Sequence, residues 1–212
     1  GVIVLFTGPS GSGKSSMLRT AANELPPKET IEVRQGEKWS IIDSDGEISL
    51  IEELADMRNT PTEDAMQAMS LAGLGEAFTM LRSFNELSDG QKYRASLTAA
   101  ILSERKHIVA DEWCSNLDRD TAKVLCKSAR KIADKKQIGI LLATAHDDLE
   151  QDLQPDIVVR CDGKGGVVVD ENPFVRGGKF GYRSTTRYGS AREPVPTGRT
   201  SLGGITEDIN CP

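Results

Sequence analysis

The sequence predicts an α/β protein whose sheet is largely parallel and flanked by helices. Three continuous apolar runs are typical of strands buried on both faces: VIVLF at 2–6, HIVAD at 107–111 and IGILLATA at 138–145. Helical stretches stand between them, at about 14–24 and 119–134. Because parallel strands need long crossover connections, this alternation favours a parallel sheet.

The remaining elements follow in order. The first helix ends before Pro26 and Pro27, KWSIID at 38–43 is expected to be a short strand, and DSDG at 43–46 a turn. Residues 47–83 are mostly helical, with breaks near Asn59 and at two glycines, which predicts a small helical insert over about 47–90. Ser88 suits the N-cap of a helix through about Leu102. Strands at 156–160 and 166–170 predict a terminal hairpin around CDGKGG.

The character of the chain changes after residue 172. We expect one domain over 1–172 and a disordered or linker tail over 173–212, because the tail is rich in Gly, Arg and Ser with little apolar periodicity. Basic residues in the tail alternate with aromatic ones, so a nucleic-acid contact is an alternative. We favour a solvated linker to a further domain over that contact. Separately, the chain lacks a starting Met, and we expect it to be a fragment of a longer protein. The basic and aromatic residues concerned are Arg176, Lys179, Phe180, Tyr182, Arg183, Arg187, Tyr188, Arg192 and Arg199.

Composition excludes several classes of protein. The chain has 212 residues, 38% hydrophobic, with a formal net charge of -6, so it is not a polyanion binder as a whole. Its four cysteines form no C-x-x-C pair and it has two histidines, so we expect thiols in a reducing cytoplasm and no zinc site. The longest apolar run is too short to span a bilayer, and no membrane insertion by this chain is expected. Trp39, Trp113 and Cys114 are assigned to packing.

A glycine-rich loop follows the first strand directly. GPSGSGKS at 8–15 fits G-x-x-x-x-G-K-[ST] in full, the phosphate-binding loop of P-loop nucleoside triphosphatases. Its backbone N–H groups and the start of the next helix would surround phosphates. Lys14 is expected to reach the β- and γ-phosphates, and Ser15 to bind Mg²⁺. The expected nucleotide-binding residues are Gly8, Pro9, Ser10, Gly11, Ser12, Gly13, Lys14, Ser15 and Ser16.

Two carboxylates close the strand at 107–111. Asp111 is expected to hold Mg²⁺ together with Ser15, directly or through water. Glu112 comes next, where a carboxylate can orient or deprotonate the water that attacks a γ-phosphate. The loop and the two acids predict hydrolysis of a nucleoside triphosphate.

The stretch NELSDGQKYR at 85–94 resembles the signature of ABC-type ATPases, usually written LSGGQ. In that family two ATPase domains pair head to tail, and each ATP lies between the phosphate loop of one and the signature of the other. The resemblance implies that Ser88, Gly90 and Gln91 complete the ATP site of a partner, in a homodimer that forms on ATP binding. A hydroxyl and N–H groups at a helix start suit an anion.

Two further motifs extend the resemblance. SNLD at 115–118 is similar to the D-loop of the family, and His146 stands where the family has its switch histidine, which implies a contact with the γ-phosphate. The motifs occur in family order across about 2–160. DEWCSNLDR and ATAHDDLEQDLQPDIVVR resemble soluble ABC-type ATPases of phage genomes and of fusions to acetyltransferase-like domains. The implied catalytic residues are Lys14, Glu112 and His146.

The sequence departs from the family pattern in three places. Asp89 replaces the first Gly of the signature, beside a partner's triphosphate, although an acid there also suits the helix dipole. No Gln takes the Q-loop position, for which Asp43 or Asp45 is a substitute. The aromatic residue that stacks on adenine would lie upstream of residue 1.

We expect Mg-dependent ATP hydrolysis by a soluble dimer with a fused or separate effector domain. The alternatives are the ATP-binding subunit of a membrane transporter, a nucleic-acid-associated ATPase of the repair type, and a structural role with slow turnover.

Overall fold

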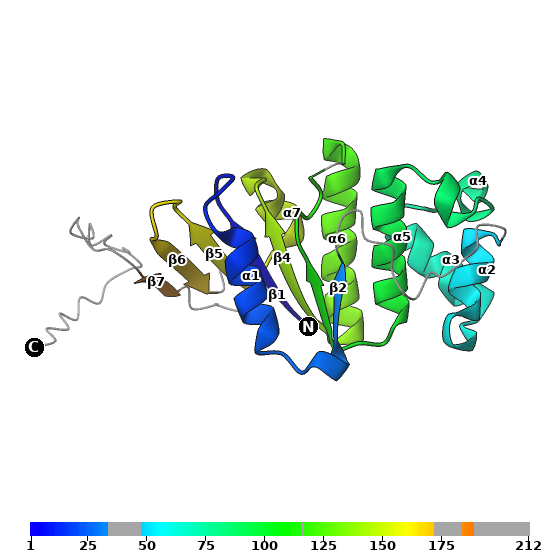
Figure 1. The fold of residues 1–212 in the computed structure, drawn as a ribbon, viewed down its shortest axis with the longest axis horizontal. Helices are drawn as coiled ribbons and strands as arrows, with labels where there is room; N and C mark the ends of the chain where they lie inside the picture. Colours follow the sequence, from blue (N-terminus) through cyan, green and yellow to red (C-terminus); the bar gives the residue numbers. More distant parts are fainter. Residues whose placement is uncertain (34–47, 116, 172–183, 189–212) are drawn as a thin grey trace, which may run out of the picture.

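The computed structural model describes residues 1–33, 48–115, 117–171 and 184–188. It holds a seven-stranded sheet in the order β2-β3-β4-β1-β5-β6-β7 (Figure 1). The strands are β1 Val2–Thr7, β2 Thr30–Val33, β3 His107–Ala110, β4 Gly139–Thr144, β5 Ile157–Cys161, β6 Val167–Glu171 and β7 Ser184–Tyr188. The first five of these are parallel, and β6 and β7 are antiparallel to their neighbours, so the predicted α/β class is confirmed.

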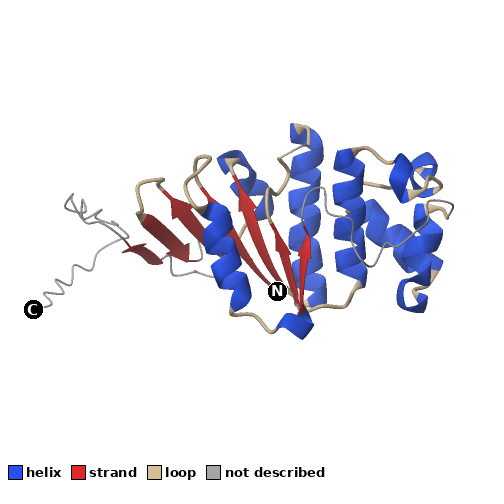
Figure 2. Cartoon of the chain, viewed as in Figure 1, coloured by secondary structure: helices blue, strands red, loops and turns tan. Residues whose placement is uncertain are grey.

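Helices cover both faces of the sheet (Figure 2). The α-helices are α1 Lys14–Asn23, α2 Leu50–Asp56, α3 Thr62–Leu71, α4 Ala77–Met80, α5 Asp89–Leu102, α6 Arg119–Lys136 and α7 Glu150–Leu153. Short 3₁₀ turns stand at Pro27–Glu29, Met57–Asn59, Phe84–Glu86 and Asp147–Leu149. The predicted helical insert is confirmed as α2, α3 and α4, which lie beyond α5 on the side away from the sheet (Figure 1).

The side chains of β1 point alternately into two hydrophobic cores, one on each face of the sheet. Successive side chains of a strand point to opposite faces. Ile3 and Leu5 accordingly belong to the large core under α5 and α6, whereas Phe6 belongs to a smaller core under α1. The apolar residues of α6 recur at helical spacing and form one buried stripe, Ala122, Leu125, Cys126, Ala129, Ile132 and Ala133.

Two strands were not foreseen. β2 has only four residues and pairs with β3, while the strand expected at 38–43 lies outside the described residues, as do Trp39, Asp43 and Asp45. β7 falls in the segment expected to be a disordered tail, so that expectation is wrong for Ser184–Tyr188. β7 is ordered because it pairs with β6 in register from Val167↔Tyr188 to Glu171↔Ser184, a contact that local composition does not encode. The rest of 173–212 lies outside the described residues.

Parallel pairing brings the carboxyl ends of the central strands to one edge of the sheet, the upper edge in Figure 1. The segments that follow β1, β3 and β4 therefore meet there. These are the segments in which the sequence predicts the site. None of the described helices combines the length and the hydropathy that crossing a membrane requires.

Candidate phosphate-binding site

The glycine loop turns between β1 and α1 through backbone angles that favour glycine. Gly8, Gly11 and Gly13 have φ of 138°, 76° and 91°. A Cβ on Gly8 would lie 2.2 Å from the carbonyl oxygen of Cys161, whereas a Cβ on Gly11 or Gly13 would meet nothing within 4 Å. The loop is therefore closely packed at its first glycine and open at the next two.

The amine of Lys14 lies inside the loop. Its Nζ donates to the carbonyl oxygens of Gly8 at 2.8 Å and Pro9 at 2.7 Å. These two carbonyl oxygens stabilise the positive charge of the Lys14 amine. A phosphate oxygen is a stronger partner for an ammonium group than a neutral carbonyl.

Ser15 and Asp111, 96 positions apart in sequence, meet beside the loop. Ser15 Oγ donates to Oδ1 of Asp111 at 2.9 Å, and the backbone N–H of Glu112 donates to the same oxygen at 2.9 Å. Arg19 lies 3.9 Å from the other carboxylate oxygen. This hydroxyl and this carboxylate are the two predicted metal ligands, and oxygen donors of this kind suit Mg²⁺.

Glu112 leaves the sheet in an unusual conformation. Its φ is 53°, in the left-handed region, and its side chain is exposed at the carboxyl edge of the sheet. The backbone N–H of Trp113 then donates to the carbonyl of Ala143 at 2.7 Å. Because Trp113 is fully buried, it anchors the turn and leaves the Glu112 carboxylate in solvent.

His146 is tied to this turn through Thr144. Thr144 Oγ1 donates to the carbonyl of Trp113 at 2.9 Å and accepts from the backbone N–H of His146 at 3.2 Å. The next residue, Asp147, accepts a 2.5 Å hydrogen bond from Thr7, the last residue of β1. The structure thus brings His146 to the same sheet edge as the glycine loop and the two acids.

The signature residues begin α5. Ser88 and Gln91 form a capping box, in which Ser88 Oγ accepts from the N–H of Gln91 at 3.4 Å and Gln91 Oε1 accepts from the N–H of Ser88 at 3.0 Å. The predicted N-cap is confirmed. Asp89 lies in the first turn with an exposed side chain, where an acid suits the helix dipole. Figure 1 places this helix start on the other side of α6 from the glycine loop, so the structure does not bring the two together within one chain.

Cys114 belongs to the core rather than to the reactive edge. Its side chain is buried, and a hydrogen bond with Cys126 together with burial raises the pKa of its thiol. Burial likewise raises the pKa of Tyr93, whose ring meets Trp113 edge to face at 6.3 Å between centroids. The assignments of Cys114 and Trp113 to packing are confirmed. Among the described residues, no three or more His, Cys, Asp or Glu side chains gather in a way that could hold a metal ion.

Sequence reasoning missed several residues of this edge: Thr7, Arg119, Thr144, Asp147 and Asp148. Arg119 lies 3.4 Å from His146 Nδ1 and 3.1 Å from Asp148 Oδ1. The position of Arg119, directly after SNLD, is the only signal that pointed to it. Asn116, the second residue of the SNLD motif, lies outside the described residues.

The sheet order, the glycine loop and the Ser15–Asp111 pair together define a P-loop nucleoside triphosphatase. The family model described as "ABC transporter" matches residues 1–115, more than half of the chain. The chain belongs to the ABC transporter family and carries its ATPase domain, which binds and hydrolyses ATP.

Relatives of known name agree with the family. The phosphonates import ATP-binding protein PhnC of Nitratidesulfovibrio vulgaris is 26% identical over 200 aligned positions. The match covers 78% of this chain and 74% of that protein. The lipoprotein-releasing system ATP-binding protein LolD of Ehrlichia ruminantium is 27% identical over 172 aligned positions, and the match covers 68% of this chain and 75% of that protein. These names favour the transporter alternative, and nothing here supports the phage or acetyltransferase-fused kind.

Solved structures show the same fold. A dimeric, post-hydrolysis state of the ATP-binding cassette MJ0796 bound to ADP and Pi aligns with a TM-score of 0.57 at 17% identity, covering 76% of this chain and 82% of that chain. The cbiO1 protein of Clostridium perfringens, part of the ABC transporter complex cbiONQ, also aligns at 0.57, with 18% identity over 76% of this chain and 74% of that chain.

Proposed function

We propose that residues 1–172 form an Mg-dependent ATPase that works as a head-to-tail dimer, with each ATP held between two copies. One observation carries this proposal. The phosphate loop and its acidic partners lie at one place, and the capped, exposed start of the signature helix lies at another, with α6 between them (Figure 1). Because the two half-sites lie on opposite sides of α6, we infer that a second copy completes each site. The MJ0796 cassette, which has the same fold, was solved as a dimer, which is consistent with a dimer here.

The residues present fit both ligands. Lys14 would exchange the carbonyls of Gly8 and Pro9 for phosphate oxygens, and the open sides of Gly11 and Gly13 leave room for phosphates against the backbone. Ser15 and Asp111 would hold Mg²⁺, which needs few protein ligands when phosphates and water supply the others. When bound, the ion neutralises charge on the β- and γ-phosphates.

The reaction is ATP plus water to ADP plus phosphate, by in-line attack on the γ-phosphate. Glu112, exposed at the edge, orients the water and takes its proton. Lys14 and the loop N–H groups stabilise the charge that develops on the phosphate oxygens. His146, fixed through Thr144, donates to the γ-phosphate. Ser88, Gly90 and Gln91 of the second copy close the site from the other side.

The first test replaces Glu112 by Gln. We expect Mg·ATP turnover in the wild type, and little turnover but an ATP-stabilised dimer in Glu112→Gln. Light scattering measures the oligomeric state of both proteins with and without ATP. ATP binding without hydrolysis in the wild type and without dimerisation in either protein would overturn the proposal.

A mixing experiment tests the shared site directly. Lys14→Ala damages one half-site and Ser88→Arg the other, so each variant alone should be inactive. In a head-to-tail mixed dimer, one site combines the intact loop of one chain with the intact signature of the other. Equal mixing should then restore roughly a quarter of the wild-type rate, because half of the dimers are mixed and one of their two sites is intact. If the mixture stays inactive while both variants fold and dimerise, the site is not shared.

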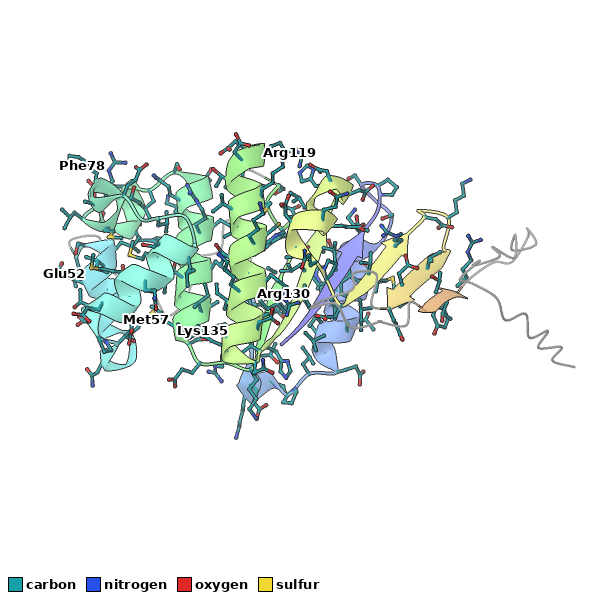
Figure 3. The ribbon with its side chains drawn as sticks, turned by 180° about the vertical axis from the view of Figure 1, so that it is seen from behind. Glu52, Met57, Phe78, Arg119, Arg130 and Lys135 are labelled. Carbon is teal, nitrogen blue, oxygen red and sulfur yellow. The ribbon has the colours of Figure 1, made fainter. Side chains whose placement is uncertain are left out.

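A membrane transporter is the setting that the named relatives favour, in preference to a free-standing soluble ATPase or one acting on nucleic acid. One structural observation agrees. Phe78 of α4 (Figure 3) is 83% exposed. Leu81, three residues later at the end of that helix, is 69% exposed, so two large apolar side chains face solvent there. Co-purification of membrane proteins with the wild type, lost in Phe78→Ser/Leu81→Ser while ATPase activity persists, would support a transporter subunit. Retention by the double variant would place the partner elsewhere.

A further inference from the structure

Arg119 is the first residue of α6, and it lies at the end of that helix nearest the catalytic edge (Figure 3). Its backbone position is fixed, because Asp118 caps the helix by accepting from the N–H of Thr121 at 2.9 Å. Its guanidinium has two partners: NH1 lies 3.1 Å from Asp148 Oδ1, and NH2 lies 3.4 Å from His146 Nδ1. Asp148 therefore holds the guanidinium in an orientation that reaches the imidazole.

The chemistry of these groups decides where the proton of His146 lies. A guanidinium is a donor only, and it does not lose its charge in proteins. A ring nitrogen that accepts from it carries no proton of its own, so the proton of the neutral ring is on Nε2. The hydrogen bonds of Thr144 fix the backbone of His146 as well, so the ring is constrained at both its backbone and its Nδ1 atom.

We propose that Arg119 is a positioning residue for His146, holding the imidazole in its Nε2–H tautomer so that Nε2–H is free to donate to the γ-phosphate. This inference rests on the proposed function, because it assigns the partner of a histidine whose role is proposed there. Arg119 touches neither substrate nor water in this scheme and acts only through His146. The Asp148 carboxylate orients Arg119 in turn.

The tautomer is measured directly in the nucleotide-free protein. The chain has two histidines, so the ¹⁵N spectrum of the imidazoles is simple, and His146→Asn identifies the signals of His107. We expect Nδ1 of His146 without a proton in the wild type, and a mixture of both tautomers in Arg119→Met. A protonated Nδ1 in the wild type, or an unchanged spectrum in Arg119→Met, would refute the contact, whether or not the chain hydrolyses ATP.

Kinetics test the consequence. Arg119→Met should lower kcat for ATP by roughly tenfold with little change in KM, since it removes a charge-assisted hydrogen bond to a residue acting in the transition state. Arg119→Lys, which keeps a donor, should recover most of the loss. In a His146→Ala background, Arg119→Met should have no further effect. An equal loss with and without His146 would show a merely structural role.

Lys127 offers a matched control on the same helix. It is exposed and lies 3.2 Å from Asp152, so Lys127→Met removes a surface ion pair of α6 away from His146. We expect its kcat and its histidine spectrum to equal those of the wild type. A wild type without ATPase activity but with the expected tautomer would overturn the proposed function and leave the contact standing, whereas an active wild type insensitive to Arg119→Met would overturn the positioning role alone.

Discussion

Alanine at the first glycine of the phosphate loop should be far more damaging than alanine at the second. β1 pairs in parallel with β5 as far as Thr7↔Arg160, so Gly8 comes next to the carbonyl of Cys161. A Cβ on Gly8 would lie 2.2 Å from that oxygen, which belongs to the backbone and cannot turn away as a flexible side chain could. Gly11 has the same need for a positive φ but open space around it. Comparing Gly8→Ala with Gly11→Ala therefore separates the cost of the steric clash from the cost of a positive φ at a non-glycine residue.

The expected magnitudes follow from these two effects. A non-glycine residue at positive φ costs about 1–3 kcal/mol, and this applies to both variants. Gly8→Ala also forces β1 and β5 apart at the loop, an overpacking cost of about 1–3 kcal/mol. We expect Gly8→Ala to be about 2 kcal/mol less stable than Gly11→Ala, which corresponds to roughly 4–8 °C in Tm for a domain of this size.

Calorimetry with and without Mg·ATP measures both stability and binding. Saturating ATP at about 100 times its Kd should stabilise the wild type by about 2.7 kcal/mol. Gly8→Ala should lose this ligand-induced shift, because the backbone that surrounds the phosphates has moved. Equal Tm values for the two variants, or an ATP shift retained in Gly8→Ala, would show that the contact with Cys161 does not shape the loop.

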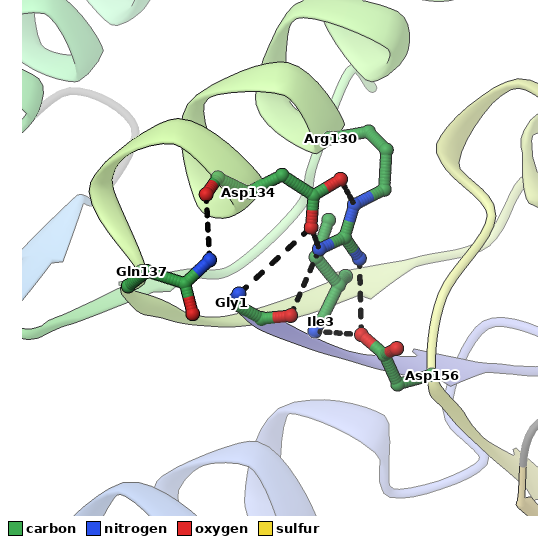
Figure 4. Close-up of polar contacts among 6 residues, drawn as sticks. All are labelled: Gly1, Ile3, Arg130, Asp134, Gln137 and Asp156. Atoms are coloured by element: carbon green, nitrogen blue, oxygen red, sulfur yellow. Dashed lines mark hydrogen bonds and ion pairs between the residues drawn. The ribbon is translucent and has the colours of Figure 1, made fainter. Parts of the chain in front are cut away.

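Two further predictions concern stability. Arg130 is buried and donates to Asp134, Asp156 and the carbonyl of Gly1 (Figure 4), so Arg130→Met should lower the free energy of unfolding in urea by about 2–4 kcal/mol. A loss below about 1 kcal/mol would contradict this prediction. Asp156→Asn added to Arg130→Met should recover part of the lost stability, because it removes the carboxylate that Arg130→Met leaves unpaired. Hydrogen bonds from Thr121 lower the pKa of Asp118, so its stabilising effect is present above its unfolded pKa and is lost as the pH falls below about 4. Asp118→Asn should therefore flatten the fall of Tm with pH in that range, and an unchanged profile would argue against the cap.

Local patterns predicted most of the fold. Apolar runs bounded by turn residues predicted five of the strands within a residue or two. For β1, β3 and β4 the reason is that burial on both faces requires an unbroken apolar segment. Ser88 was predicted as a cap because its hydrogen bonds are made within three residues. β2 and β7 were missed, since four or five residues at a sheet edge are stabilised by the neighbouring strand rather than by their own pattern.

The candidate site also has parts that local sequence motifs predicted and parts that they did not. The sequence alone determined the glycine loop, the two acids after β3 and the signature, because each is a contiguous motif whose chemistry depends on neighbours in the chain. Only the tertiary structure decided that Ser15 meets Asp111, that Gly8 lies against Cys161, and that Arg119 reaches His146. Those contacts join segments far apart in sequence, and they exist because parallel pairing of β1, β3, β4 and β5 brings the carboxyl ends of the strands to one edge.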